Sequence, residues 1–485
     1  MLDPLRWLIL VAAFAAVSGA CVGQGVGDRT YYPEELREDL ELLRTTIHEA
    51  HADPYRYVSR AELDRLFDRL RDGLGTTLSV SSFIDSVEVV LRAIGDGHTS
   101  CELPLEDAAR LERRIPIMPM ELSVIDGGLY VRRDKMDFRS IAPGSRVLSI
   151  DGMAAEEIIR TLMDEAICDG RSRNGALRLV ENDFAILHGM RFGFRTEHKL
   201  VCENVHGVLE QVVVHSLTGE EMAATRPSQE ELLPWRVTFH EDRSLAWVEM
   251  TTLDAMALAD ADQRPEKFLG ELLRELEKKE VGILVLDLRG AAGVDLGMAE
   301  QVFALVAQKP FRVVQSMAVR SITVPTWYRR AVPLDDFYAS AGGRFALEEA
   351  GLYVLHPNDE RLKDLPASYR RFEGGVYVLQ DGLTREAAAA VGILAKRSGR
   401  GKLLGEEAGT NSFSYCGGRE LLITAPNTGV RFTVPLIRYV FDGAASGPNE
   451  LGELPDITLQ PDAGSLVTGE DGIRKAALTV IEGLR

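Results

Sequence analysis

The stretch 376–390, VYVLQDGLTREAAAA, has the residue order of a strand, a tight turn and a helix start. Val376 to Leu379 are an apolar run, Asp381 and Gly382 form a turn signal, and the pattern predicts a helix that opens at Thr384. Such a turn exposes a side chain at the end of a strand, where the free N–H groups of the helix favour negative charge. The junction therefore suits attack by a nucleophile that generates an anion.

The residues present do not supply that nucleophile. Segment 381–390 contains no serine, cysteine or lysine, and its only hydroxyl belongs to Thr384. Glu386 falls in the first predicted helical turn, where a carboxylate stabilises a helix by about 0.3–1 kcal/mol. We favour this helix-capping interpretation of Glu386 over a new role as an acid or base.

Two further turns carry groups that could take part in the same chemistry. In 94–100, IGDGHTS, glycines flank a turn that presents His98 as a base, with Asp96 available to fix its tautomer. A surface turn in which His98 only forms hydrogen bonds is the competing interpretation. Segment 289–293, RGAAG, offers backbone N–H groups that could line an oxyanion pocket, or it is a plain strand-to-helix turn.

Strands and helices must bring these turns together. The run 282–288 is apolar enough to be a central parallel strand, and 235–485 alternates strand and helix patterns. We predict the following division: a signal peptide at 1–21, a helical cap at 30–110, a PDZ-like module at 111–165, a connecting α/β segment at 166–234, and a core at 235–485 with an insertion at 318–374. The insertion holds Trp327, Tyr328 and Tyr338 and is a candidate lid or a family-specific decoration.

The net charge, the N-terminal segment and the cysteine spacing limit the partners and the cellular location that we expect. The 485 residues include 55 basic and 74 acidic side chains, a net charge of −19 that argues against nucleic acid. The apolar run 7–20 ends in small residues before Cys21, which predicts export to the periplasm or cell envelope, with Cys21 as a candidate lipidation site and membrane tether. The cysteines lack CxxC spacing, so we predict no metal site, and we predict no cofactor.

Seven short motifs in sequence carry a resemblance to a known family. They are HADPY at 51–55, GDGHT at 95–99, PG at 143–144 with SIDG at 149–152, LDLRG at 286–290, the 376–390 unit, GE at 405–406, and Gly452 with PDI at 455–457. In this order they resemble the tail-specific, or C-terminal processing, serine peptidases, including the tricorn-core and retinoid-binding-protein-like branches. The resemblance implies an α/β fold with a crotonase-like ββα spiral core, the helical cap and the PDZ-like module.

The resemblance also implies roles for individual positions. The family's serine falls on Glu386 and a family glutamate on Ala389, so both are replaced. His98 takes the base position of the histidine branch, whereas the lysine of the other branch falls near Asn411. The substrate and oxyanion region is formed by Gly290, Gly293 and Ala387, although Ala291 and Ala292 replace the usual asparagine and glycine, and Glu450 is a loose match to a distal acid.

Three hypotheses follow from these positions. The first is an exported family member that binds peptides or protein C-termini and has reduced or lost hydrolysis, because a carboxylate is a poor nucleophile whose acyl product is an unstable anhydride. The second is an active peptidase with Glu386 as general base, or with a nucleophile displaced to Ser412, Ser414 or Cys416, and His98 in support. The third is a small-ligand carrier. The sequence does not define an oligomeric state.

Overall fold

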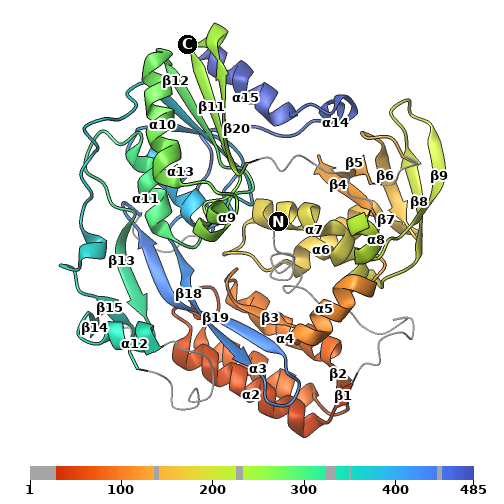
Figure 1. Ribbon diagram of the computed structural model, residues 1–485. Coiled ribbons are helices and arrows are strands. Elements are labelled where there is room, and N and C mark those ends of the chain that lie inside the picture. Colours follow the sequence, from red (N-terminus) through yellow and green to blue (C-terminus); the bar gives the residue numbers. More distant parts are fainter. Residues whose placement is uncertain are drawn as a thin grey trace.

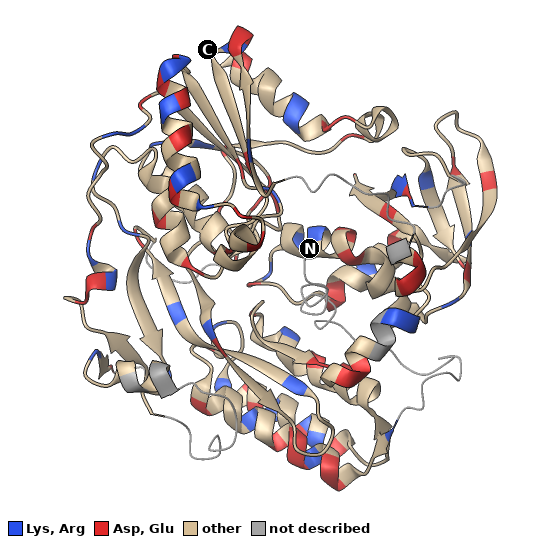
Figure 2. Ribbon diagram, viewed as in Figure 1, with Lys and Arg blue, Asp and Glu red and all other residues tan. Residues whose placement is uncertain are grey.

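The computed structural model describes residues 29–135, 141–224, 233–323, 335–348, 351–444 and 450–484 (Figure 1). The predicted signal peptide, Cys21, Trp327 and Tyr328 lie outside these residues. Within the described ranges, no helix has the length and apolar character needed to span a bilayer. In Figure 2, basic and acidic side chains alternate along outer helices such as α2 (Pro33–Ala50) and α10 (Pro265–Lys278). This mixture is typical of a solvated surface.

A six-stranded sheet organises the C-terminal half. Its strands, in spatial order, are β10 (Trp235–His240), β11 (Leu245–Met250), β12 (Ile283–Asp287), β16 (Gly375–Gln380), β17 (Lys402–Gly405) and β20 (Ile457–Thr458). Only β10 pairs antiparallel, and β12 lies between two parallel neighbours, which confirms the predicted central parallel strand. Parallel neighbours end at the same edge, so the turns after β12 and β16 lie close together.

The two faces of this sheet are covered by different helices because successive strand residues point to opposite sides. Leu284 and Leu286 belong to the core formed with α10, α11 (Leu296–Ala304) and α13 (Glu386–Arg397). Val285 belongs instead to the core formed with α15 (Gly472–Gly483), whose Ala477 and Ile481 are fully buried. The sheet is thus buried on both faces, as its continuous apolar strands require.

A second, antiparallel sheet joins the N-terminal helices to this core. Its order is β14 (Phe345–Leu347), β15 (Tyr353–Leu355), β13 (Val314–Val319), β19 (Arg431–Phe441) and β18 (Ser414–Thr424), and β3 (Ser100–Glu102) pairs with β19. Helices α2, α3 (Arg60–Gly73) and α4 (Val80–Ile94) share a buried core with the β19 end of this sheet. Because β3 directly follows the His98 turn, its pairing with β19 fixes that turn against the core. A short pair, β1 (Thr30–Tyr31) with β2 (Leu78–Ser79), lies beside these helices.

The third sheet extends beyond the predicted boundary of the PDZ-like module. Its order is β4 (Met120–Ile125), β5 (Gly128–Asp134), β6 (Arg146–Ile150), β8 (Glu197–Glu203) and β9 (Leu209–His215), with β7 (Met153–Ala154) beside β6. Strands β8 and β9 fall in the segment that we predicted to be a connector after residue 165, yet β8 pairs with β6. Helices α6 (Ala155–Glu165) and α7 (Arg173–Phe192) cover this sheet, and α5 (Leu105–Arg114) contacts α8 (Gly219–Ala224).

Candidate active site

His98 is presented by a turn that begins where α4 ends. Gly95 closes the helix in the left-handed region with φ 66°, which a glycine adopts without strain. Asp96 then accepts the backbone N–H of His98 at 3.3 Å and contacts Nε2 of His51 at 3.0 Å. Since the N–H of Asp53 donates to Nδ1 of His51, the proton of that ring lies on Nε2 and points to Asp96.

The sequence predicts that Asp96 fixes the tautomer of His98, but the structure does not show this contact. Oδ1 of Asp96 lies 3.7 Å from Nδ1 of His98, beyond hydrogen-bond distance. The buried Nδ1 of His98 has no hydrogen-bond partner among the described residues. Asp96 therefore organises the turn and His51, and Nδ1 of His98 is left without a bond.

Glu386 lies on a strained turn at the start of α13. Its φ is +54°, a conformation that costs a residue with a Cβ on the order of 1–3 kcal/mol. The helix starts at Glu386, so the predicted start at Thr384 is wrong. Thr384 Oγ1 instead donates to the carbonyl of Leu288 at 2.9 Å and accepts the N–H of Asp381 at 2.9 Å. The loop is thereby tied to the end of β12.

Other backbone contacts hold the same turn in place. The N–H of Glu386 donates to Oγ1 of Thr410 at 2.7 Å, and the N–H of Arg385 donates to the carbonyl of Ala291 at 2.9 Å. Asp381 accepts the N–H groups of Gly290 and Leu383, each at 2.9 Å. Several hydrogen bonds therefore hold the strained backbone in place, as is common for strained turns at functional sites.

The structure brings the side chains of His98 and Glu386 into direct contact. Nε2 of His98 lies 2.8 Å from Oε1 of Glu386, and the two side chains are only 10% and 11% exposed. The helix-capping interpretation of Glu386 therefore misses its main contact, which joins two turns 288 residues apart. The two residues form the centre of the candidate site.

Their electrostatics favour an imidazolium–carboxylate pair. Burial alone acts to raise the pKa of Glu386, but the hydrogen bond and charge of His98 outweigh it, and the pKa is lowered. Burial alone acts to lower the pKa of His98, but the carboxylates of Asp96 and Glu386 raise it well above its usual value. At neutral pH His98 thus carries the proton that a general base would need to accept.

The three positions expected to line an oxyanion pocket are occupied by the protein's own groups. The N–H of Gly290 donates to Asp381, and the N–H of Ala387 donates to the carbonyl of Gly293 at 3.0 Å. The N–H of Gly293 bonds the Glu386 carboxylate and helps to lower its pKa. Gly293 must be glycine because a Cβ there would lie 2.5 Å from the carbonyl oxygen of Leu253. None of these three N–H groups is free to bind a tetrahedral oxyanion.

The residues considered as a displaced nucleophile are buried. Ser412, Ser414 and Cys416 are 6%, 1% and 5% exposed, and burial raises the pKa of the Cys416 thiol well above its usual value. A neutral, buried thiol is unreactive. Asn411, near the family's lysine position, bonds Arg56 and Tyr57. Glu450 contacts Arg171 at 3.7 Å with its side chain 53% exposed, so the loose match to a distal acid gains no support.

Sequence reasoning missed two residues at this centre. Asp169 accepts the N–H of Gly97 at 2.9 Å, and the ring of Tyr415 lies 5.8 Å from that of His98. Both come from segments far from the His98 turn along the chain. The Asp169–Gly170 pair is a turn signal like Asp96–Gly97, and it is the one local hint that could have marked Asp169.

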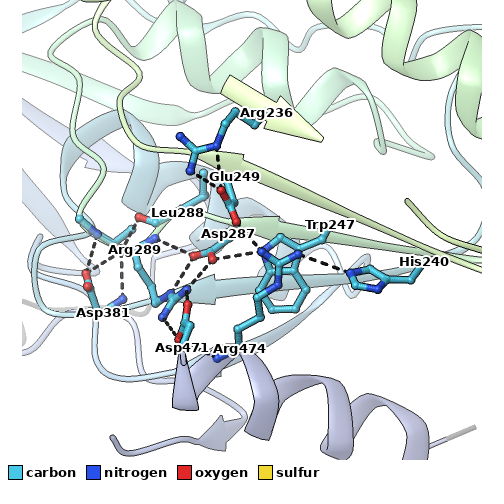
Figure 3. Close-up of polar contacts among 12 residues, drawn as sticks. Arg236, His240, Trp247, Glu249, Asp287, Leu288, Arg289, Asp381, Asp471 and Arg474 are labelled. Atoms are coloured by element: carbon cyan, nitrogen blue, oxygen red, sulfur yellow. Dashed lines mark hydrogen bonds and ion pairs between the residues drawn. The ribbon is translucent and has the colours of Figure 1, made fainter. Parts of the chain in front are cut away.

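A charged network supports the Gly290 turn from the side of α15 (Figure 3). Arg289 bridges Asp287 at 2.7 Å and Asp471 at 2.6 Å. Nearby, Arg474 bonds Glu249 at 2.6 Å, and Glu249 also pairs with Arg236. Three arginines and three carboxylates are therefore paired at the carboxyl end of β12.

Comparison with known proteins identifies a family match and solved structures with a similar fold. Residues 245–459 match Peptidase family S41. The solved structure of mature CPAF complexed with lactacystin has a TM-score of 0.65 and 14% identity, and the match covers 92% of this chain and 97% of that one. A structure of mature CPAF has a TM-score of 0.62 and 12% identity over 93% of this chain and 98% of the other.

A photosystem II D1 C-terminal processing protease matches less closely, with a TM-score of 0.41 and 15% identity over 90% of this chain and 98% of that one. No curated protein matches the sequence. Residues 245–459 form a domain of peptidase family S41, the tail-specific peptidase family that the motifs resemble.

Proposed function

We propose that this protein uses an S41 peptidase scaffold to bind peptides or unstructured protein C-termini, with hydrolysis reduced or lost. The observation that carries the proposal is the 2.8 Å contact between Nε2 of His98 and Oε1 of Glu386. Amide hydrolysis by the family's route needs a serine at this turn and a neutral base beside it. Here the serine position holds a carboxylate, and that carboxylate helps to keep the base, His98, in its protonated form.

The state of Glu386 also weakens the case for it as a general base acting on water. A base works best when its pKa lies near the operating pH, whereas the pKa of Glu386 is lowered below its usual value. In addition, the N–H of Ala387 is committed to Gly293, so a tetrahedral intermediate would lack that donor.

The proposal includes the finer features that the resemblance implies: a crotonase-like spiral core, a helical cap and a PDZ-like module, in a protein exported through its N-terminal signal and tethered by lipidated Cys21. In the PDZ-like module, β4 lies at a sheet edge and α7 packs against it. The N–H of Val124 on β4 donates to Glu181 of α7 at 3.3 Å. An extended peptide that added to this edge would replace that contact with its own carbonyl.

Calorimetric titration with unstructured peptides tests the proposal. We expect a peptide with a free C-terminal carboxylate to bind and its C-terminally amidated twin to bind more weakly. Mass spectrometry of the same mixtures after long incubation should show intact peptide. Absence of binding by every peptide would contradict the binding role, and steady cleavage would contradict the loss of hydrolysis.

A further inference from the structure

The polar groups beyond His98 form a second, deeper feature of the same region. Nε2 of His98 faces Glu386, whereas Nδ1 points toward Asp96 and has no hydrogen-bond partner in the described part of the chain. Asp169 lies next to both, so that one ligand atom from each of Asp96, His98 and Asp169 falls within 4.8 Å of the others. Asp96 and Asp169 are 7% and 8% exposed.

A small cavity adjoins this cluster and carries a second unpartnered group. Asp96, Asp169, Tyr415 and Arg56 are among its lining residues, and its volume of about 10 Å³ is close to what one water needs. The hydroxyl of Tyr415 has no partner among the described residues, although the residue is only 1% exposed. Buried polar atoms are nearly always bonded, so the unpartnered Nδ1 of His98 and hydroxyl of Tyr415 indicate a ligand missing from this region.

The charges of the cluster point to a cation. Asp96, Asp169 and Glu386 lie around His98, and Asp96 also contacts His51. The guanidinium of Arg56, which lines the cavity, is directed to Asn411 and the carbonyl of Ser414. The carboxylates of Asp96 and Asp169 repel each other in this buried setting, and a bound cation would remove the repulsion.

We propose that Nδ1 of His98 and the carboxylates of Asp96 and Asp169 bind a divalent transition-metal ion, with a water in the adjoining cavity as a further ligand. Glu386 would then accept the Nε2–H of neutral His98, which directs the Nδ1 lone pair to the metal. A carboxylate that orients a metal-bound histidine in this way is a recurrent feature of metal sites. One imidazole and two carboxylates suit Zn²⁺ or Mn²⁺.

The distances are compatible with this assignment after a small movement. Zinc bonds to nitrogen and oxygen of about 2.0–2.2 Å place tetrahedral ligands roughly 3.3–3.6 Å apart. Nδ1 of His98 and Oδ1 of Asp96 are already 3.7 Å apart. The 4.8 Å limit on the full set means that the Asp169 side chain has to move by about 1.5 Å or less. We predicted no metal site because the cysteines lack a metal-binding spacing. The proposed ligands come instead from two turns, which a search for a cysteine motif does not find.

Calorimetric titration of the chelator-treated mature protein with Zn²⁺, and separately with Mn²⁺, tests this site. We expect one equivalent of at least one of the two ions to bind, with affinity lost by at least 100-fold in His98→Ala and Asp169→Asn. Glu386→Gln, which keeps an oxygen toward Nε2 but removes the charge, should weaken binding about 10- to 100-fold.

His198→Ala is the matched control, because His198 also contacts a carboxylate, that of Asp151 at 2.8 Å, but lies in the β4–β9 sheet. Its affinity should equal that of the wild type. Circular dichroism checks that each variant is folded, and Asp169→Asn carries the test if His98→Ala unfolds. Failure of both ions to bind, or binding that survives Asp169→Asn, would overturn the proposal. Neither result depends on whether the protein binds peptides.

Discussion

Two charged clusters lie at the carboxyl ends of adjacent parallel strands, and they are built differently. After β12, the network around Arg289 pairs three arginines with three carboxylates. After β16, three carboxylates, those of Glu386, Asp96 and Asp169, lie around His98, and Nδ1 of that ring has no bond among the described residues. One cluster is balanced and the other is not.

The difference distinguishes a network that stabilises the fold from a cluster that is suited to bind a ligand. A balanced, fully bonded network stabilises one position of the Gly290 turn and gains nothing from a ligand. An unbalanced buried cluster costs free energy until a ligand completes it, which is why perturbed groups gather at functional sites. The same comparison predicts opposite effects of removing a charge from the two clusters.

The largest expected effect is loss of stability in Arg289→Met. The substitution leaves Asp287, which is 6% exposed, with its carboxylate buried beside Asp471 and without its guanidinium. Breaking a buried pair in this way costs about 3–5 kcal/mol. Urea denaturation measures it, and Arg370→Met, which breaks a solvent-exposed pair with Glu277, is the control with a much smaller cost. Equal costs in the two variants would remove the distinction between the clusters.

Asp169→Asn should instead stabilise the metal-free protein at high pH. The folded pKa of Asp169 is raised from 3.8 to about 6 by burial, so wild-type stability falls as pH rises through that window. The variant should gain about 3 kcal/mol at pH 8, since each pKa unit corresponds to about 1.4 kcal/mol. It should match the wild type near pH 3.5, where both side chains are neutral. Thermal unfolding at the two pH values checks this, and destabilisation at pH 8 would contradict it.

Glu386→Gln should destabilise the chelator-treated protein in a pH-dependent manner. The lowered pKa of Glu386 contributes stability above about pH 4.5, and the raised pKa of His98 contributes stability that is full below about pH 6.5 and declines above it. We therefore expect the largest cost, about 2 kcal/mol, between these values. The cost should shrink as pH rises through the raised pKa of His98. A cost that grows steadily toward pH 9.5 would show that the ion pair is wrongly assigned.

The smallest effect concerns the backbone of the same residue. Glu386→Gly and Glu386→Ala both remove the carboxylate, but only alanine keeps the strain of φ +54°. The glycine variant should be more stable by about 1 kcal/mol, the reverse of the order expected in an ordinary helix. Urea midpoints of the two variants measure the difference. A more stable alanine variant would mean that this turn is not strained.

The features that could be predicted from the sequence are those that short local patterns mark. The strand at 282–288, the turn after 380 and the family follow from apolar runs, Asp-Gly signals and ordered motifs. The contact between His98 and Glu386 could be inferred only through the family resemblance. It depends on the long-range pairing of β3 with β19, which brings the two turns together and which no local pattern marks. Asp169 and Tyr415 were missed because their roles depend on long-range packing. The place of β8 and β9 in the third sheet was missed because nothing local marks the pairing of β8 with β6.

The most direct test of the central claim is reaction of the mature protein with a fluorophosphonate serine probe, read by intact mass, beside hydrolysis of an unfolded casein substrate. The contact between His98 and Glu386 predicts no adduct and no cleavage by a protein shown to be folded. An adduct that forms with turnover would contradict it, and mapping that adduct would identify the serine responsible.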